Sequence, residues 1–315
     1  MRPNLGTLVT ALLASAFATE AGAQGLGRVH FETSCTPQAQ EKFDRGLAMV
    51  HSFFYPDSVQ AFTEAAAADP QCAIAYWAIA ISHRPNPLIL PLTATVLKNG
   101  LEAVEKGKAI GAKTERERDW LSAIESYYKD YDKVDQTTRG LAYEKAMEAL
   151  MQKYPDDPEA AIFYALALNE TALHSDKTFA NQLKAGAILE KVEAKLPDHP
   201  GVLHYLIHTY DYPTLAQRGL AAANRYAEVA PASASCPTHA LAYLLHARDV
   251  DAVGRFEHEI SGDRPGGGGQ ALARGDISRR AAPAGLHGIC AAANGTGGSC
   301  EAASRRQQRY KKARV

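Results

Sequence analysis

The chain has 315 residues, of which 46% are hydrophobic and 22% are charged, so it is long enough for one or two domains with a sizeable core. These fractions exclude a collagenous, an intrinsically disordered or a multi-span membrane protein. The formal net charge of −1 gives the whole chain no electrostatic basis for binding nucleic acid.

Residues 1–23 have the pattern of a secretory signal peptide. Arg2 gives a positive start, Leu5–Ala18 is mostly small and apolar, and Ala21-Gly22-Ala23 is a small-x-small cleavage pattern. The apolar run is too short to span a bilayer, and a buried N-terminal helix is the alternative interpretation. We therefore expect a bacterial protein exported to the periplasm or secreted, with no transmembrane segment in the mature chain, where disulfides are permitted.

The sequence pattern of residues 24–233 predicts an all-α domain. Apolar residues recur at i, i+3 and i+4, and proline-centred turns interrupt the pattern at Pro70, Pro155, Pro197 and Pro231. The last two prolines are 34 residues apart, which is the period of the tetratricopeptide repeat (TPR), a helical hairpin that stacks into an α-solenoid. We therefore expect a TPR-like solenoid with a curved inner face.

Individual residues fit this repeat as well. Gly46, Phe62, Ala65 and Pro70 are separated by 16, 3 and 5 residues, as are the small, aromatic, small and turn positions of the repeat. Further hairpins are predicted to begin near Ala73, Pro158 and Pro200. Residues 85–133 break the register, and we interpret them as an insertion that carries extra helix, including a charged helix around 114–129.

Over residues 29–233 the chain resembles a family of exported bacterial TPR proteins of largely unassigned function. The resemblance depends on these segments: Phe31 with Ser34-Cys35, Phe43 with Gly46, His51-Ser52-Phe53, Asp69-Pro70 with Cys72, Tyr76-Trp77, Asn86-Pro87-Leu88, Lys113-Thr114-Glu115-Arg116-Glu117, Tyr154-Pro155-Asp156-Asp157, Phe163-Tyr164-Ala165-Leu166, Asp198-His199-Pro200-Gly201, His204-Tyr205, Ile207-His208 and Tyr210-Asp211-Tyr212-Pro213. It implies the same solenoid fold and assigns no activity.

After about Ser233 the chain departs from that family. The family continues with His-Met-Pro-Ser-His-Ile-Phe, and codons allowed for residues 239–245, read one nucleotide later, spell the last six of these residues. We interpret 234–315 as an out-of-frame, disordered tail, and a genuine basic tail is the alternative. Residues 241–315 hold 12 Lys and Arg against 7 Asp and Glu, and 12 of the 24 glycines. Sequencing the coding DNA around codons 230–245 decides between the two.

One helix face carries a candidate metal site. His204, His208 and Asp211 are spaced i, i+4 and i+7, so they lie on one face, and two imidazoles with a carboxylate suit a divalent metal. No Glu follows His204, so the HExxH motif of zinc proteases is absent. The alternative is that these are polar groove residues that form ordinary hydrogen bonds.

The same inner face of the other hairpins is predicted to carry groove residues. These residues and the three candidate metal ligands form the expected binding groove: His51, Trp77, Arg84, Asn169, Glu170, His204, His208 and Asp211. Such a mixture suits a peptide or a small polar ligand. The alternative is that Trp77, like Phe43, packs between helices, and His199 is expected to cap the helix that follows it.

Cysteine placement predicts one disulfide. Cys35 precedes the first predicted helix and Cys72 follows its partner, and an antiparallel hairpin brings those ends together. Cys236, Cys290 and Cys300 lie in the tail that we interpret as out of frame, and they receive no assignment.

The leading functional hypothesis is an exported interaction scaffold that binds a peptide or protein partner on its concave face. The alternative is a metal-binding protein or metal-dependent enzyme that uses His204, His208 and Asp211. No catalytic residues are assigned, since no enzyme triad, Gly-rich cofactor loop or complete metal motif is present, and a non-enzyme is favoured. No cofactor is expected beyond that divalent metal. A truncated stack without function is the third reading.

Overall fold

The computed structural model describes residues 25–84, 92–173 and 175–234, and the regular elements in this part of the chain are all helices, with no strand. The expected signal peptide (1–23) and the tail from residue 235 lie outside the described residues. The helices are α1 (Pro37–His51), α2 (Tyr55–Ala68), α3 (Ile74–Ser82), α4 (Ala94–Ile110), α5 (Glu115–Tyr128), α6 (Gln136–Lys153), α7 (Pro158–Thr171), α8 (Ala180–Glu193), α9 (Pro200–Thr209), α10 (Ala216–Val229) and α11 (Pro231–Ala234).

Helix starts follow from local sequence. Pro37, Pro158 and Pro200 occupy the first turn of α1, α7 and α9, where a missing N–H costs no hydrogen bond. Thr114 caps α5 in a capping box with Glu117, so the charged helix predicted around 114–129 is confirmed. His199 caps α9 by accepting a hydrogen bond from the Val202 N–H, as the sequence predicts.

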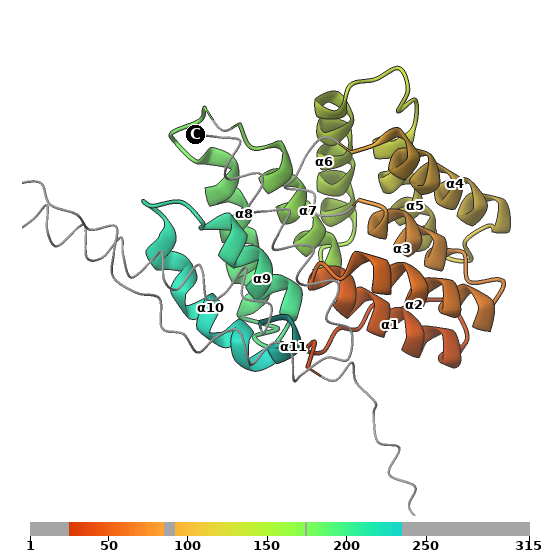
Figure 1. Ribbon diagram of the computed structural model, residues 1–315, viewed down its shortest axis with the longest axis horizontal. Coiled ribbons are helices and arrows are strands. Elements are labelled where there is room, and N and C mark those ends of the chain that lie inside the picture. Colours follow the sequence, from red (N-terminus) through yellow and green to blue (C-terminus); the bar gives the residue numbers. More distant parts are fainter. Residues whose placement is uncertain (1–24, 85–91, 174, 235–315) are drawn as a thin grey trace, which may run out of the picture.

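Each helix packs against the next one along the chain, so the fold is a succession of antiparallel hairpins. Figure 1 shows the hairpins following one another around a curve, from α1–α2 through α5–α6 to α9–α10. Residues 92–133 form α4 and α5 within this succession, α4 against α3 and α5 against α6. The structure thus places this stretch in the stack itself, although its sequence register is irregular.

The odd-numbered helices form the inner layer, because contacts that skip one helix join α1 with α3, α3 with α5, and α7 with α9. Gly46, the small residue predicted to lie where two helices touch, does lie at such a contact. A Cβ on Gly46 would approach the Phe62 ring to 2.7 Å. This close approach explains why the α1–α2 hairpin needs glycine at that position.

The centre of the curve is filled with aromatic side chains. Trp77 of α3 packs edge-on against Trp120 of α5 with ring centroids 4.7 Å apart, and Phe163 of α7 lies within 6 Å of both rings. Phe31, from the segment before α1, stacks on Trp77. All four side chains are at most 1% exposed, so the inner face is a core and not an open channel.

Two links hold the segment before α1 in place. The buried Glu117 carboxylate accepts hydrogen bonds from the backbone and side chain of Ser34, at 2.8 and 2.7 Å. Cys35 and Cys72 form a disulfide, which is the pairing expected from the hairpin geometry. Both links tie this segment to elements that lie far along the chain.

Candidate functional site at the closure of the helical ring

The two ends of the stack meet. Helix α1 contacts α9, and the backbone N–H of Ala232 donates to the Gly25 carbonyl over 2.9 Å. In Figure 1 the first hairpin and α9 to α11 accordingly lie side by side at the lower edge of the molecule. We call this contact between the first and last hairpins of the described residues the ring closure. The polar groups concentrated there make it the first candidate site.

A buried carboxylate lies at the centre of the ring closure. Glu159, in the first turn of α7, accepts from Nε2 of His51 at 3.0 Å and from Nε2 of His199 at 2.9 Å. The Tyr205 hydroxyl lies 3.1 Å from the other ring nitrogen of His51. All four residues are buried, so α1, α7 and α9 are joined by one internal polar network.

Burial sets the protonation of this network. Burial lowers the pKa of His51 below its ordinary value, although Glu159 opposes the shift. Burial alone would raise the pKa of Glu159, but the electrostatic attraction and hydrogen bonds of the His51 and His199 N–H groups outweigh it and lower the pKa. Burial also raises the pKa of Tyr205, so its hydroxyl keeps its proton and can donate.

His51, Glu159 and His199 form the one group of three metal-ligating residues in the described ranges whose ligand atoms all lie within 4.8 Å of one another. The helix cap argues for hydrogen bonding instead. Because Nδ1 of His199 accepts from the Val202 N–H, its Nε2 carries the proton and donates to Glu159. His51 donates in the same way and accepts from Tyr205. The network is thus satisfied by its own members.

Gly201 makes room for this network. A Cβ at Gly201 would lie 2.3 Å from Nδ1 of His51, so only glycine lets α9 approach α1 this closely. Three consecutive residues therefore have separate roles here. His199 supplies an imidazole, Pro200 starts α9, and Gly201 leaves space for the His51 ring.

A second pair of imidazoles lies beside the network, nearer the surface. His204 is 2% exposed, and its Nδ1 lies 2.6 Å from the carbonyl oxygen of His51. Its Nε2 faces Nε2 of His208 at 3.1 Å. Asp211 is exposed, and within the described residues His204, His208 and Asp211 do not form a three-ligand group. The expected three-ligand site is therefore corrected to a pair of histidines.

Aromatic rings hold both imidazoles of the pair. The ring of Phe53 lies 4.4 Å from His204 and stacks on His208, and Tyr226 stacks on His204. Phe53 itself has a φ of 59°, a left-handed conformation that is costly for a bulky residue. The tight turn from α1 into α2 thus places this ring against α9.

A buried ion pair occupies the middle of the inner layer. Arg84 pairs with Glu170 of α7, and their side chains are 4% and 3% exposed. The guanidinium also lies over the rings of Tyr127 and Tyr143, 4.1 and 4.4 Å from their centroids. Burial raises the pKa of Tyr143 to about 12, so its hydroxyl is neutral.

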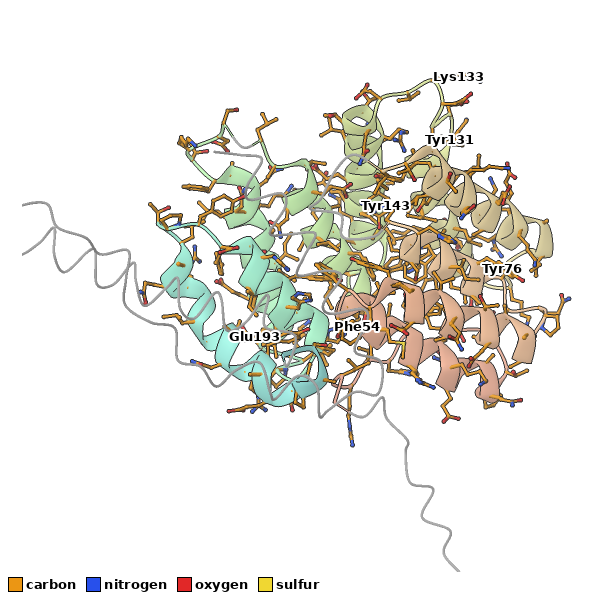
Figure 2. The ribbon with its side chains drawn as sticks, in the orientation of Figure 1. Phe54, Tyr76, Tyr131, Lys133, Tyr143 and Glu193 are labelled. Carbon is orange, nitrogen blue, oxygen red and sulfur yellow. A yellow bond between two sulfur atoms is a disulfide. The ribbon has the colours of Figure 1, made fainter. Side chains whose placement is uncertain are left out.

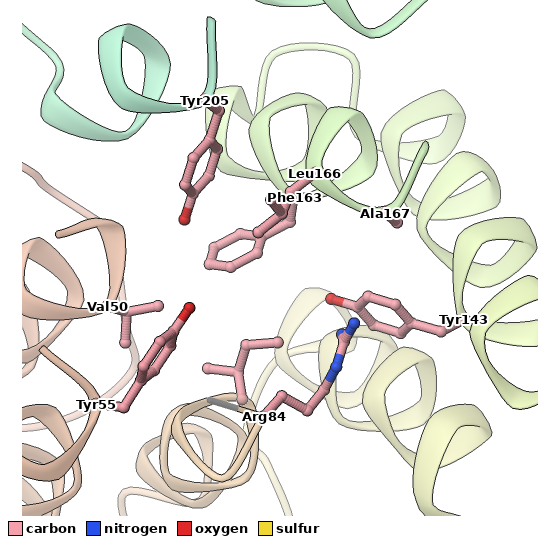
Figure 3. Close-up of a pocket in the computed structure, with 9 residues that line it drawn as sticks. Val50, Tyr55, Arg84, Tyr143, Phe163, Leu166, Ala167 and Tyr205 are labelled. Carbon is pink, nitrogen blue, oxygen red and sulfur yellow. The ribbon is translucent and has the colours of Figure 1, made fainter. Parts of the chain in front are cut away.

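Between this ion pair and the ring closure lies a small cavity (Figure 3). Its volume is about 10 Å³, the space of about one water molecule, and its walls include Tyr55, Tyr143 and Tyr205. Figure 3 shows the three hydroxyl groups pointing toward the same space beside Phe163. A cavity of this size does not admit a peptide side chain.

The structure corrects the expected position of the groove residues. His51, Trp77, Arg84 and His204 are at most 4% exposed, and the Glu170 side chain is 3% exposed. Asn169 is half-buried and donates to Thr209 of α9. Because the aromatic side chains fill the inner face, these residues lie in the interior, and the expected packing role of Trp77 is the one observed.

Sequence reasoning missed Glu159 and Phe53. Glu159 follows Pro158 at a helix start, where acidic residues are common for their effect on the helix dipole, so nothing in the local pattern marks it as buried. Phe53 lies in a turn without glycine. The signal available was Gly201, since a glycine inside a helix often marks a close approach of another element.

The outer surface carries an open groove. It has a volume of about 480 Å³ and lies over α3 between α2 and α4, and it is lined by Thr63, Ala66, Ala67, Tyr76, Ile79, Glu102, Ala103 and Lys106. Figure 2 labels Tyr76 at the right of the molecule, in the region of α3 and α4. The floor is apolar, and the Lys106 ammonium lies 4.8 Å from the centre of the Tyr76 ring.

No protein family, curated protein or solved structure matches this chain. Within the described residues, no helix combines the length and the apolar character needed to cross a membrane.

Proposed function

We propose that this chain is an exported, TPR-like repeat protein that binds a peptide segment of a partner protein. The binding site is the outer groove between α2 and α4. The observation that carries the proposal is the groove itself, whose volume of about 480 Å³ falls in the range of ligand sites. The consecutive hairpins and the Gly46–Phe62 contact support the TPR-like assignment.

The inner face is not proposed as the binding surface. Phe43, Trp77 and Trp120 are fully buried there, and the one cavity described above, next to Arg84, holds about one water molecule. A peptide would have to displace the core to enter. The concave-face hypothesis therefore gives way to a site on the outer side of the same hairpins.

The chemistry of the groove indicates what its partner presents. Ala67, Tyr76 and Ile79 offer apolar surface that stays partly exposed, which suits a large apolar side chain. Lys106 is exposed at the rim, and no carboxylate among the described residues is within ion-pair distance of it. We therefore propose a partner segment with an apolar residue next to an acidic one.

The test uses random peptides displayed on phage, selected on the full chain. Enriched peptides should combine an apolar with an acidic residue and should bind the wild type. Ala67→Arg places a long charged side chain in the groove at an exposed helix position, so binding should be lost. Ala221→Arg, at an exposed position of α10, is the matched control and should bind as the wild type does.

A charge variant makes the test sharper. Lys106→Glu should weaken binding of the selected acidic peptides while leaving the helix intact, because position 106 is exposed. Peptides that bind Ala67→Arg as tightly as the wild type would overturn the proposed site. Selection that enriches no peptide at all would overturn the proposed function.

Export is part of this proposal. The signal-like residues 1–23 and the Cys35–Cys72 disulfide support it, since structural disulfides persist in oxidising compartments. Expression in bacteria, followed by fractionation and N-terminal sequencing, should find a periplasmic chain that begins at Gln24. A full-length chain that stays in the cytoplasm with Met1 intact would contradict export.

A further inference from the structure

We propose that His204 and His208 form a two-ligand binding site for a divalent transition metal of the copper, nickel and zinc group. The site lies on α9 at the ring closure. It is independent of the peptide groove, which belongs to α2, α3 and α4. Imidazole nitrogen is the ligand type that these metals prefer among protein side chains.

The distance between the two nitrogens fits joint coordination. Nε2 of His204 and Nε2 of His208 lie 3.1 Å apart. Two nitrogens that each lie about 2.0–2.1 Å from one metal, at an angle near a right angle or a little wider, are separated by about 3 Å. The spacing of four residues places both rings on one face of α9, as in helical metal sites with paired histidines.

The tautomer of His204 is set for metal binding. Its Nδ1 lies 2.6 Å from a carbonyl oxygen, so that nitrogen carries the proton and donates to His51. The lone pair is then on Nε2, which faces His208. Ligating histidines commonly donate their second nitrogen to a backbone carbonyl, which fixes the ring and raises its basicity.

The surroundings favour a positive charge at this point. The carbonyl that accepts from His204 belongs to His51, the last residue of α1, and helix C-terminal carbonyls carry partial negative charge. Phe53 and Tyr226 stack on the imidazoles and fix their planes. His208 is only half-buried, so water can reach the metal and complete its coordination.

The neighbouring network does not offer the same chemistry. There Glu159 occupies Nε2 of both His51 and His199, and the cap at Val202 requires the proton of His199 on Nε2. At the histidine pair, the competing arrangement is a hydrogen bond from Nε2 of His208 to Nε2 of His204. Metal binding requires the ring proton of His208 to move from Nε2 to Nδ1, so that both Nε2 atoms present a lone pair, and it leaves the hydrogen bond from His204 to His51 in place.

The experiment titrates Cu²⁺, Ni²⁺ and Zn²⁺ separately into the full, untagged chain by calorimetry in a buffer that does not bind metal. His208→Ala is the principal variant, because its half-buried side chain can be removed without opening the core. His208→Gln keeps the side-chain length. His30→Ala, which removes an exposed imidazole hydrogen-bonded to Asp44, is the matched control.

We expect the wild type and His30→Ala to bind one equivalent of metal that both His208 variants bind at least about tenfold more weakly. The electron paramagnetic resonance spectrum of the Cu²⁺ complex should show two coordinated nitrogens in the wild type and fewer in His208→Gln. Circular dichroism checks that the variants are folded. Equal metal binding by the wild type and the His208 variants, or a copper spectrum without two nitrogens, would overturn the proposal.

Discussion

Glu159 and His51, 108 positions apart in sequence, are joined by a hydrogen bond of 3.0 Å in which neither side chain is more than 1% exposed. The bond links α7 to α1 across the inner layer, and His199 adds a second link from the start of α9. Because no water replaces a lost partner at this depth, the fold depends on this carboxylate more than on any exposed ion pair.

Removing the carboxylate should therefore be costly. We expect Glu159→Ala to lower the free energy of unfolding by about 3–5 kcal/mol, because two buried imidazole N–H groups lose their acceptor at about 1–3 kcal/mol each. Urea denaturation measures the change. Glu228→Ala, which breaks an exposed pair with Arg225, is the control and should cost less than about 1 kcal/mol. Equal losses for the two variants would contradict the role of the network.

The Glu159 carboxylate should also make the free energy of unfolding sensitive to acid. The pKa of Glu159 lies below its ordinary value of 4.5 in the folded state, so its contribution is complete above about pH 5 and is lost as the pH falls toward the folded pKa. The stability difference between wild type and Glu159→Gln should consequently shrink between about pH 5 and pH 3. Denaturation midpoints measured across that range test this. A difference that stays constant would show that the pKa is not lowered.

The Arg84–Glu170 pair should show strong coupling. Arg84→Met alone leaves a buried carboxylate without its partner and should cost about 3–5 kcal/mol, and Glu170→Met should cost a similar amount. The double variant should lose much less than the sum, since both charges are gone and apolar side chains replace them. A double-mutant cycle by urea denaturation gives the coupling energy. Strictly additive losses would mean that the pair does not act as a unit.

The Cys35–Cys72 disulfide should stabilise the folded state by roughly 3–4 kcal/mol on the chain-entropy model. Urea denaturation with and without a thiol reductant measures the difference. The variant Cys35→Ala with Cys72→Ala should show the lower stability in both conditions and no response to reductant. A wild type that is equally stable when reduced would argue against any contribution from this bond.

Two glycines in helices should respond in opposite ways to alanine. A Cβ at Gly46 would meet the Phe62 ring at 2.7 Å, so Gly46→Ala should destabilise by about 1–3 kcal/mol through overpacking. At Gly140 the nearest atom would be 3.7 Å away, so Gly140→Ala should stabilise by about 0.5–1 kcal/mol through better helix propensity. Thermal unfolding of both variants checks the signs, and a shift in the same direction for both would be inconsistent with this packing.

Much of the fold could be predicted from local sequence patterns. Pro158 and Pro200 start α7 and α9 as predicted, Thr114 caps α5, and Gly46 contacts Phe62 at the expected spacing, because each of these depends on residues within one hairpin. The Cys35–Cys72 pairing follows from the same short-range geometry.

The position of the candidate site could not be predicted in this way. It arises where α1 meets α9, between residues about 150 positions apart, such as His51 and His204. No periodicity of a single hairpin indicates whether a stack stays open or curves until its ends touch. The amount of curvature depends on the packing of large aromatic residues, such as Trp77 and Trp120, between successive inner helices. An open groove was therefore expected where the structure has a filled interior.

The contact between α1 and α9 changes how this protein should come apart. In an open array each terminal repeat has a single neighbour and frays first, so protection of backbone amides from hydrogen exchange declines toward both ends. Here the first and last hairpins cover one another, and neither can peel away without breaking the bonds at His51. Amides in α1 and α9 should thus exchange as slowly as those in α5, through one concerted opening of the whole ring.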